Sequence, residues 1–219
     1  MKIFAVNGSP RKDWNTASLL KNMLEGAARR GAETELIHLY DLDYKGCRSC
    51  FACKRVGTAG YGRCAVKDDL SPLLAAMTEG ADALIVGSPI YFGMISGETQ
   101  SFLERLLFPN LVYSAPPSSL FPRQIASVSL FTMNVTEELS REMGYPANFA
   151  RQSEFMERIL GGPARIFACY DTCQFADYSK VIMEMMDPAR KIQRHQDVFP
   201  EECRRAAAMG EALAGRKTP

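Results

Sequence analysis

The chain has 219 residues, 47% of them hydrophobic and 23% charged, so it can bury a sizeable core and is not expected to be disordered. Its 26 basic and 25 acidic residues leave a net charge of +1, which gives no reason to expect binding to nucleic acid or to an anionic membrane. No run of about 18 apolar residues could cross a bilayer, and the apolar stretch after Lys2 is too short for a signal-peptide core, so we expect a cytoplasmic protein with no membrane partner.

The opening of the chain predicts a strand, a polar loop and a helix in succession. Residues 3–6 are a short apolar run, and residues 7–13 hold Gly, Pro and polar residues that favour turns. The apolar residues that follow recur with helical spacing: Leu19, Leu20, Met23, Leu24 and Ala27.

The loop between this strand and this helix is a candidate phosphate site. A helix that begins near Asn15 leaves backbone N–H groups unpaired at its N-terminus, and the helix dipole favours an anion there. Ser9 and Thr16 add neutral donors, and Arg11 adds a charged group that suits phosphate oxygens. With Gly8 as its one glycine the loop matches neither the Walker loop nor the dinucleotide fingerprint, and an ordinary strand-to-helix turn is the alternative.

The rest of the chain continues the alternation of strands and helices, which predicts one α/β domain over residues 1–219 with a doubly wound sheet of five parallel strands. Long segments without a clear pattern are expected to be loops: a cysteine-bearing loop over 44–68, the segment 88–96, and a surface excursion over 109–122. Further strands are predicted at 34–39, 83–87, 125–131 and 164–169.

Helices are predicted between these strands and at the end of the chain. Asp68 or Asp69 can cap a helix that ends at Gly80, and apolar residues around 102–107 mark another. Residues 136–160 are expected to be helical with a break at 144–146. The C-terminal helices over 177–214 include one that runs to about Met186 and a last one over 200–213, and the Lys and Arg residues after Ala189 predict a solvated helical surface.

In a doubly wound sheet, ligands bind at the carboxyl ends of the strands where the strand order reverses. The loops after strands one, three and four should therefore converge, namely residues 9–17, 89–93 and 132–134. The first offers anion donors, and the second offers the aromatic rings of Tyr91 and Phe92 beside Gly93. This division suits flavin mononucleotide (FMN), with a phosphate at one end and a flat ring at the other, while ordinary packing of the two aromatic residues is the alternative.

Seven cysteines are present, and four of them lie between positions 47 and 64. In a reducing compartment this clustering favours metal binding or redox chemistry over disulfide bonds. The Cys-x₂-Cys-x₂-Cys run of Cys47, Cys50 and Cys53 is typical of ferredoxin-type clusters, whereas structural zinc sites more often join two separate pairs. A [4Fe-4S] cluster, a zinc site and free thiols all remain open. The other three are expected to pack as small apolar side chains: Cys169, Cys173 and Cys203.

The anion-type first loop, the β-α alternation and the Ser88-Pro-Ile-Tyr91 motif together resemble the flavodoxin-like NAD(P)H-dependent FMN reductase superfamily. The segment 46–53 with Cys64 and the Asp68-Asp69 pair resembles its iron–sulfur flavoprotein branch. The resemblance implies a flavodoxin-like strand order of 2-1-3-4-5, FMN, NAD(P)H as reductant, a [4Fe-4S] cluster, and a homodimer or homotetramer in which flavin and cluster lie across subunit contacts.

The resemblance also implies roles for individual residues, and it implies no catalytic side chain because the chemistry belongs to the flavin. Ten residues separate Cys53 from Cys64, about twice the family gap, so the fourth metal ligand departs from the family pattern. The implied cofactor-binding residues are Ser9, Arg11, Asn15, Thr16 and Ala17 for the phosphate and Pro89, Ile90, Tyr91, Phe92 and Gly93 for the ring, and the implied metal ligands are Cys47, Cys50, Cys53 and Cys64. Thr132 and Asn134 are added as cofactor-binding candidates because they belong to the third of the converging loops.

The expected function is that of an FMN-dependent oxidoreductase or electron-transfer flavoprotein. It would pass electrons from NAD(P)H or ferredoxin to a small acceptor, and its partners would be a small molecule or a ferredoxin-like protein. The alternatives are a non-catalytic electron carrier of the same fold and a zinc or thiol protein without flavin turnover.

Overall fold

The computed structural model describes residues 1–215 of the chain, and its centre is a five-stranded parallel sheet. The order across the sheet is β2 (Glu33–His38), β1 (Lys2–Asn7), β3 (Ala83–Tyr91), β7 (Ile125–Thr132) and β8 (Gly161–Cys169). Each neighbouring pair is parallel. The predicted flavodoxin-like order 2-1-3-4-5 is therefore confirmed, because these are the first to fifth long strands of the chain.

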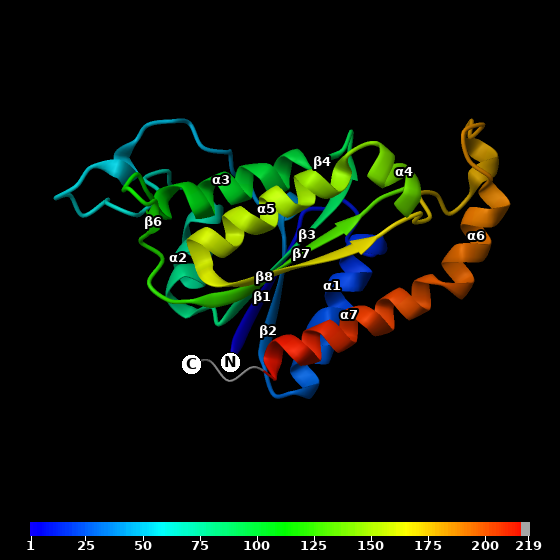
Figure 1. Cartoon of the computed structure of the whole chain (residues 1–219), viewed down its shortest axis with the longest axis horizontal. Coiled ribbons are helices and arrows are strands. Elements are labelled where there is room, and N and C mark those ends of the chain that lie inside the picture. The colour runs from blue at the N-terminus through cyan, green and yellow to red at the C-terminus, as the bar shows by residue number, and fades with distance from the viewer. Residues whose placement is uncertain (216–219) are drawn as a thin grey trace.

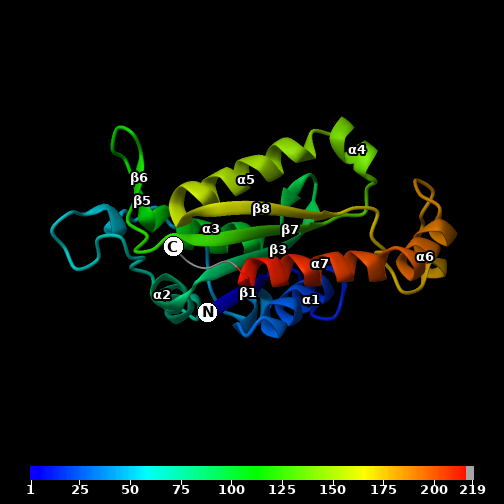
Figure 2. The same cartoon turned by 60° about the horizontal axis from the view of Figure 1, so that its bottom comes forward.

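Helices cover both faces of the sheet (Figures 1 and 2). On one face, α2 (Leu70–Gly80), α3 (Gly97–Asn110) and α5 (Tyr145–Leu160) pack against Phe4 and Val6 of β1. On the other face, α1 (Asn15–Arg29) and α7 (Phe199–Ala214) pack against Ile3 and Ala5. Successive residues of β1 thus point to opposite faces and into two separate cores, which is why its apolar run is continuous.

The α1 and α7 helices approach each other closely because glycines face the contact on both sides. A Cβ atom on Gly210 would lie 1.8 Å from the Met23 carbonyl oxygen, and one on Gly26 would lie 1.9 Å from the Ala207 carbonyl oxygen. The last helix is fixed by this contact to the helix that follows the first strand. No helix among residues 1–215 is long and apolar enough to cross a membrane.

The segment 88–96 is not the plain loop that the sequence predicts. The β3 strand continues to Tyr91, turns at Phe92 and Gly93, and returns as the short β4 (Met94–Ile95). Phe92 and Gly93 have φ of 51° and 81°, the two successive positive values that a type I′ hairpin turn requires. Because a bulky residue rarely adopts a positive φ, nothing in the sequence marks Phe92 as a turn residue.

The segments 109–122 and 136–160 are close to their predictions. The first is a surface excursion as expected, with a two-stranded ribbon of β5 (Leu111–Val112) and β6 (Ser118–Ser119). The second divides into α4 (Glu137–Glu142) and α5 at Gly144, whose φ is 76°, so the predicted break is confirmed. Neither Asp68 nor Asp69 caps α2 with its side chain, because the Asp68 carboxylate binds Arg105 and the Asp69 carboxylate accepts a hydrogen bond from the Asp43 N–H. Short 3₁₀ turns occupy Leu39–Asp41, Ala52–Lys54 and Tyr178–Lys180.

The predicted helix that runs to about Met186 is wrong. Only the turn at Tyr178–Lys180 is helical there, and the next helix, α6 (Pro188–Asp197), begins after the segment that was expected to be helical. Asp187 accepts a hydrogen bond from the Ala189 N–H at 2.9 Å, and Pro188 occupies the first helical turn, a combination that starts a helix at this point. The predicted solvated surface is also wrong at Lys191, whose side chain is buried.

Candidate functional site

A cavity of about 130 Å³ lies at the carboxyl ends of β1, β3 and β7, where the three loops converge as the sequence predicts. This edge is where the strand order reverses between β1 and β3. Nine of the twelve expected cofactor residues line the cavity: Ser9, Arg11, Asn15, Thr16, Pro89, Ile90, Tyr91, Thr132 and Asn134.

The loop after β1 is held in place from within. The buried Asn7 accepts a hydrogen bond from the Ser9 N–H at 3.1 Å, and Ser9 Oγ accepts one from the Arg11 N–H at 3.2 Å. Trp14, the residue before α1, makes no side-chain cap, so the N–H groups of the first helical turn are not satisfied by a capping side chain. Thr16 hydrogen-bonds Thr132 of β7 at 2.8 Å, which ties the first loop to the neighbouring strand end. This edge of the cavity is suited to an anion.

A fourth loop, residues 171–174 after β8, completes the cavity, and the sequence interpretation did not include it. The Cys173 carbonyl oxygen accepts hydrogen bonds from Trp14 Nε1 at 3.0 Å and from Asn15 Nδ2 at 2.7 Å. The Arg11 guanidinium donates to the Gln174 carbonyl oxygen. The rule that strand ends converge could have found this loop, since β8 is parallel to the others. The lining residues that were missed are Trp14, Met133, Thr172 and Gln174.

Three expected cofactor residues do not line the cavity. Ala17 is fully buried in α1, and Phe92 at the hairpin tip is completely exposed. A Cβ atom on Gly93 would lie 2.9 Å from the Tyr145 ring, and the Gly93 carbonyl oxygen accepts a hydrogen bond from Asn148 at 3.2 Å. The hairpin therefore stands at the rim of the cavity, where a ring bound beside it would meet solvent.

One polar atom of a residue that lines the cavity has no hydrogen-bond partner among residues 1–215. The side-chain oxygen of Asn134 is buried and accepts no hydrogen bond from any of the described residues. Buried acceptors are normally satisfied, so an orphaned acceptor in a cavity wall fits a ligand that donates a hydrogen bond. FMN, which carries ribityl hydroxyls and a ring N–H, has such donors.

The four clustered cysteines line one small hollow of about 20 Å³, although they come from two ends of a long loop. Burial raises the pKa of the Cys53 thiol, whereas a backbone hydrogen bond from Ala52 lowers the pKa of Cys50. Among residues 1–215, no three His, Cys, Asp or Glu side chains are already grouped as metal ligands. The donor set has the thiol chemistry of an iron–sulfur site, and the thiols would have to draw together to form one.

Arg105 of α3 connects this loop to the body of the protein. Its guanidinium donates to both Asp68 carboxylate oxygens at 2.8 and 3.1 Å, to the Lys45 carbonyl at 2.8 Å and, through Nε, to Cys64 Sγ at 3.0 Å. These bonds explain how Cys64 reaches the hollow despite the ten-residue gap. By contrast, burial raises the pKa of the Cys169 thiol to about 12, in keeping with its predicted packing role.

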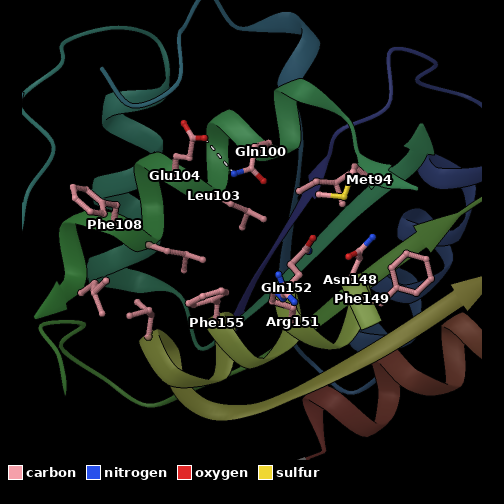
Figure 3. Close-up of a pocket in the computed structure, with 14 residues that line it drawn as sticks. Met94, Gln100, Leu103, Glu104, Phe108, Asn148, Phe149, Arg151, Gln152 and Phe155 are labelled. Carbon is pink, nitrogen blue, oxygen red and sulfur yellow. Dashed lines mark hydrogen bonds between the residues drawn. The ribbon is translucent and has the colours of Figure 1, made fainter. Parts of the chain in front are cut away.

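An apolar groove of about 350 Å³ lies between α3 and α5 (Figure 3). Met94 of the hairpin lines one end, while Glu104 and Phe108 line both the groove and the hollow. Met94 and Phe155 are about half exposed along it, at 54% and 47%. The groove thus connects the rim of the cavity with the cysteine loop.

The sheet order and the cavity at its switch point define a flavodoxin-like α/β protein. The sequence model of the NADPH-dependent FMN reductase family matches residues 1–134, more than half of the chain, and the chain belongs to that family.

Among curated relatives, an iron-sulfur flavoprotein from Archaeoglobus fulgidus is 41% identical over 105 residues, which are 48% of this chain and 48% of the relative. One from Methanosarcina thermophila is 30% identical over 105 residues, 48% of this chain and 52% of the relative. The chain therefore spans about half the length of the curated relatives it matches.

Solved structures show the same fold over nearly the whole chain. An NAD(P)H:quinone oxidoreductase from Methanothermobacter marburgensis superposes with a TM-score of 0.67 at 16% identity, covering 97% of this chain and 98% of that one. An FMN-dependent NADH-azoreductase from Bacillus anthracis does so with a TM-score of 0.61 at 13% identity, covering 98% and 100%. At these identities the likeness concerns the fold alone.

Proposed function

We propose that this chain is an FMN-dependent oxidoreductase that takes electrons from NAD(P)H or a reduced ferredoxin and passes them to a small acceptor in the cytoplasm. Bound FMN supplies the hydride and electron transfer, and the side chains of the protein bind and orient it. The observation that carries the proposal is the cavity at the switch point, with anion donors at one edge and the Tyr91 hairpin at the other. Steady-state NAD(P)H oxidation with a quinone or free flavin as acceptor separates this enzyme from a non-catalytic carrier.

In this proposal the first loop and the Asn134 side-chain oxygen bind different parts of the cofactor. Arg11, Asn15 and the first-turn N–H groups of α1 would bind the terminal phosphate, and Asn134 would accept a hydrogen bond from the ribityl chain or ring. FMN rather than FAD is proposed, because the loop can take one terminal phosphate and lacks the glycine fingerprint for a pyrophosphate.

Replacing Arg11 by Ala tests the phosphate site. The variant loses a charged hydrogen-bonding partner, so FMN binding should weaken by about 1.5–3 kcal/mol, roughly 10- to 150-fold in Kd. Lys12→Ala is the matched control, since Lys12 is the next residue but pairs with Asp41. Titration of apoprotein with FMN, followed by flavin fluorescence, measures both. Equal affinity in Arg11→Ala and wild type, or FAD in the released cofactor, would contradict the assignment.

We also propose that Cys47, Cys50, Cys53 and Cys64 hold a [4Fe-4S] cluster when the loop is loaded. The support is the convergence of the four thiols on one hollow and the Arg105 contacts that bring Cys64 to it. In a reducing compartment such as the cytoplasm, cysteines stay as free thiols or bind metal and rarely form disulfides, so either state of these cysteines is compatible with the proposed location. The alternative hypotheses for these four cysteines are a structural zinc site and inert thiols.

We propose that two copies of the chain cover the flavin ring. A site that encloses a small molecule usually measures about 300–1,000 Å³, so the smaller cavity here holds part of a mononucleotide and leaves the rest at the rim. Phe92 at that rim is completely exposed, and the apolar groove with Met94 and Phe155 begins beside it. A second copy seated on this surface would bury both features, and sedimentation equilibrium of the purified chain tests for the homodimer or homotetramer.

The proposed redox protein would dock on the cysteine loop, which is strongly basic in a chain of net charge +1. Residues 44–68 contain one acidic residue, Asp68, which is engaged by Arg105. Complementary charge steers association, so an acidic ferredoxin suits this surface. The six basic residues of the loop are Lys45, Arg48, Lys54, Arg55, Arg63 and Lys67.

Reversing two of these charges tests the docking surface. Arg55→Glu/Lys67→Glu should slow reduction of the protein by a reduced acidic ferredoxin at low salt by about tenfold or more, because steering is lost. Arg30→Glu, at the far end of α1, is the control. Stopped-flow absorbance measures the rate, and a rate that depends neither on salt nor on these charges would contradict docking here.

A further inference from the structure

The α6 helix reaches the cavity wall from a part of the chain that lies outside residues 1–134. Its Lys191 side chain is only 3% exposed, and Nζ donates hydrogen bonds to the Asn134 carbonyl oxygen and to the Asp171 carboxylate. Lysine is almost never fully buried unless it is paired, so these two contacts are the reason that it can lie there. Figure 1 shows α6 at the end of the molecule where the loops after β7 and β8 leave the sheet.

Both acceptors belong to loops that form the cavity. Asn134 lines it, and Asp171 immediately precedes Thr172, which also lines it. The two loops are bonded to each other as well, because the Asp171 N–H donates to Val135 O at 2.8 Å and the Thr172 N–H to Met133 O at 2.9 Å. Asp171 has φ of 53°, an uncommon backbone conformation that these contacts hold in place.

The loop of residues 171–174 is therefore held from two sides. On one side Arg11, Trp14 and Asn15 donate to its carbonyl groups, and on the other side Lys191 binds the Asp171 carboxylate. The first three residues belong to the proposed phosphate loop. A shift of Asp171 would thus move the carbonyl groups against which the phosphate-binding side chains are positioned.

We propose that Lys191, paired with Asp171, is a positioning residue for the cofactor, which fastens the loops after β7 and β8 together and holds the far wall of the cavity. The inference rests on the proposed FMN site and extends it to the C-terminal third of the chain. Arg190 and Arg194 also approach the other Asp171 oxygen, at 3.3 and 3.8 Å, but Lys191 joins Asp171 to the Asn134 carbonyl. Lys191 therefore bridges the two loops.

The bridge is tested by the rate at which FMN leaves the loaded full-length chain, followed by the rise of flavin fluorescence on dilution. Lys191→Met should release FMN at least about tenfold faster, the loss expected when a hydrogen bond from a charged group is removed. Arg190→Met is the matched control, since Arg190 touches Asp171 from a mostly exposed position, and its release rate should stay within about twofold of wild type.

A double variant separates positioning from simple stability. Lys191→Met alone leaves a buried carboxylate with fewer partners, whereas Lys191→Met/Asp171→Asn removes both charges, so the double variant should recover much of the apoprotein melting temperature. If Lys191 positions the wall, the double variant still releases FMN quickly. The inference would be overturned if Lys191→Met released FMN at the wild-type rate. It would also be overturned if the double variant recovered both the wild-type release rate and the wild-type stability. A wild-type chain that binds no FMN would instead overturn the proposed function.

Discussion

Replacing Arg105 by Met should lower the free energy of unfolding by about 3–5 kcal/mol, the usual cost of removing one partner of a buried ion pair. The Arg105 side chain is fully buried, and its partner Asp68 is only 14% exposed. The variant leaves the Asp68 carboxylate largely out of water without its bidentate partner. Urea denaturation at pH 7 measures the difference, and the cysteine loop is expected to loosen first.

The pH dependence of this difference has a defined sign. The Arg105 guanidinium holds the pKa of Asp68 below its usual range. A carboxyl group with a depressed pKa in the folded state adds stability above its unfolded pKa and loses it as the pH falls through the folded pKa. The difference in free energy of unfolding between wild type and Arg105→Met should therefore become smaller below about pH 3.9, the ordinary pKa of Asp.

Arg63→Met is the control for both measurements. Arg63 lies in the same loop, but its side chain is 78% exposed and its contact with Glu79 is 3.9 Å long. Exposed pairs of this kind contribute about 0–1 kcal/mol, so the control should stay close to wild type. Equal stabilities of Arg105→Met and Arg63→Met would show that the buried contacts do not hold the loop.

Replacing Cys50 by Ser should abolish iron binding while FMN stays bound. Anaerobically purified wild type is expected to contain about four irons and four sulfides per chain, and removal of one thiolate ligand should prevent assembly of the cluster. Cys50 is exposed at the edge of the hollow, and its lowered pKa favours the thiolate that a metal needs. Metal and sulfide analysis, with the flavin absorbance as internal reference, measures the effect.

Cys203→Ser is the matched control, because Cys203 lies in α7, away from the cysteine loop. It should keep the full complement of iron and of FMN. The proposal of a [4Fe-4S] cluster would be contradicted by stoichiometric zinc in the wild type, or by the absence of metal after anaerobic reconstitution. The protein would then be a flavin reductase with a thiol-rich loop.

The sequence by itself determined the sheet and most of the cavity. The apolar run of residues 83–87 reads as a strand covered on both faces, and β3 is buried there. Once the alternation predicts parallel strands, their carboxyl ends must share one edge, so Asn15, Pro89 and Thr132 could be brought together without any knowledge of contacts. These conclusions depend on local periodicity and on chain direction, and both can be inferred from neighbouring residues without knowledge of distant contacts.

Only the tertiary structure decided the fourth loop of the cavity, the place of α6 and the anchoring of Cys64. Lys191 looks like a solvated helical residue until Asp171 and Asn134 are found beside it, and Arg105 looks like a surface residue of α3 until Asp68 closes over it. Arg105 and Asp68 are 37 residues apart, and Lys191 and Asn134 are 57. A buried charge is stable only with partners such as these, and no local propensity records which distant residue will supply them.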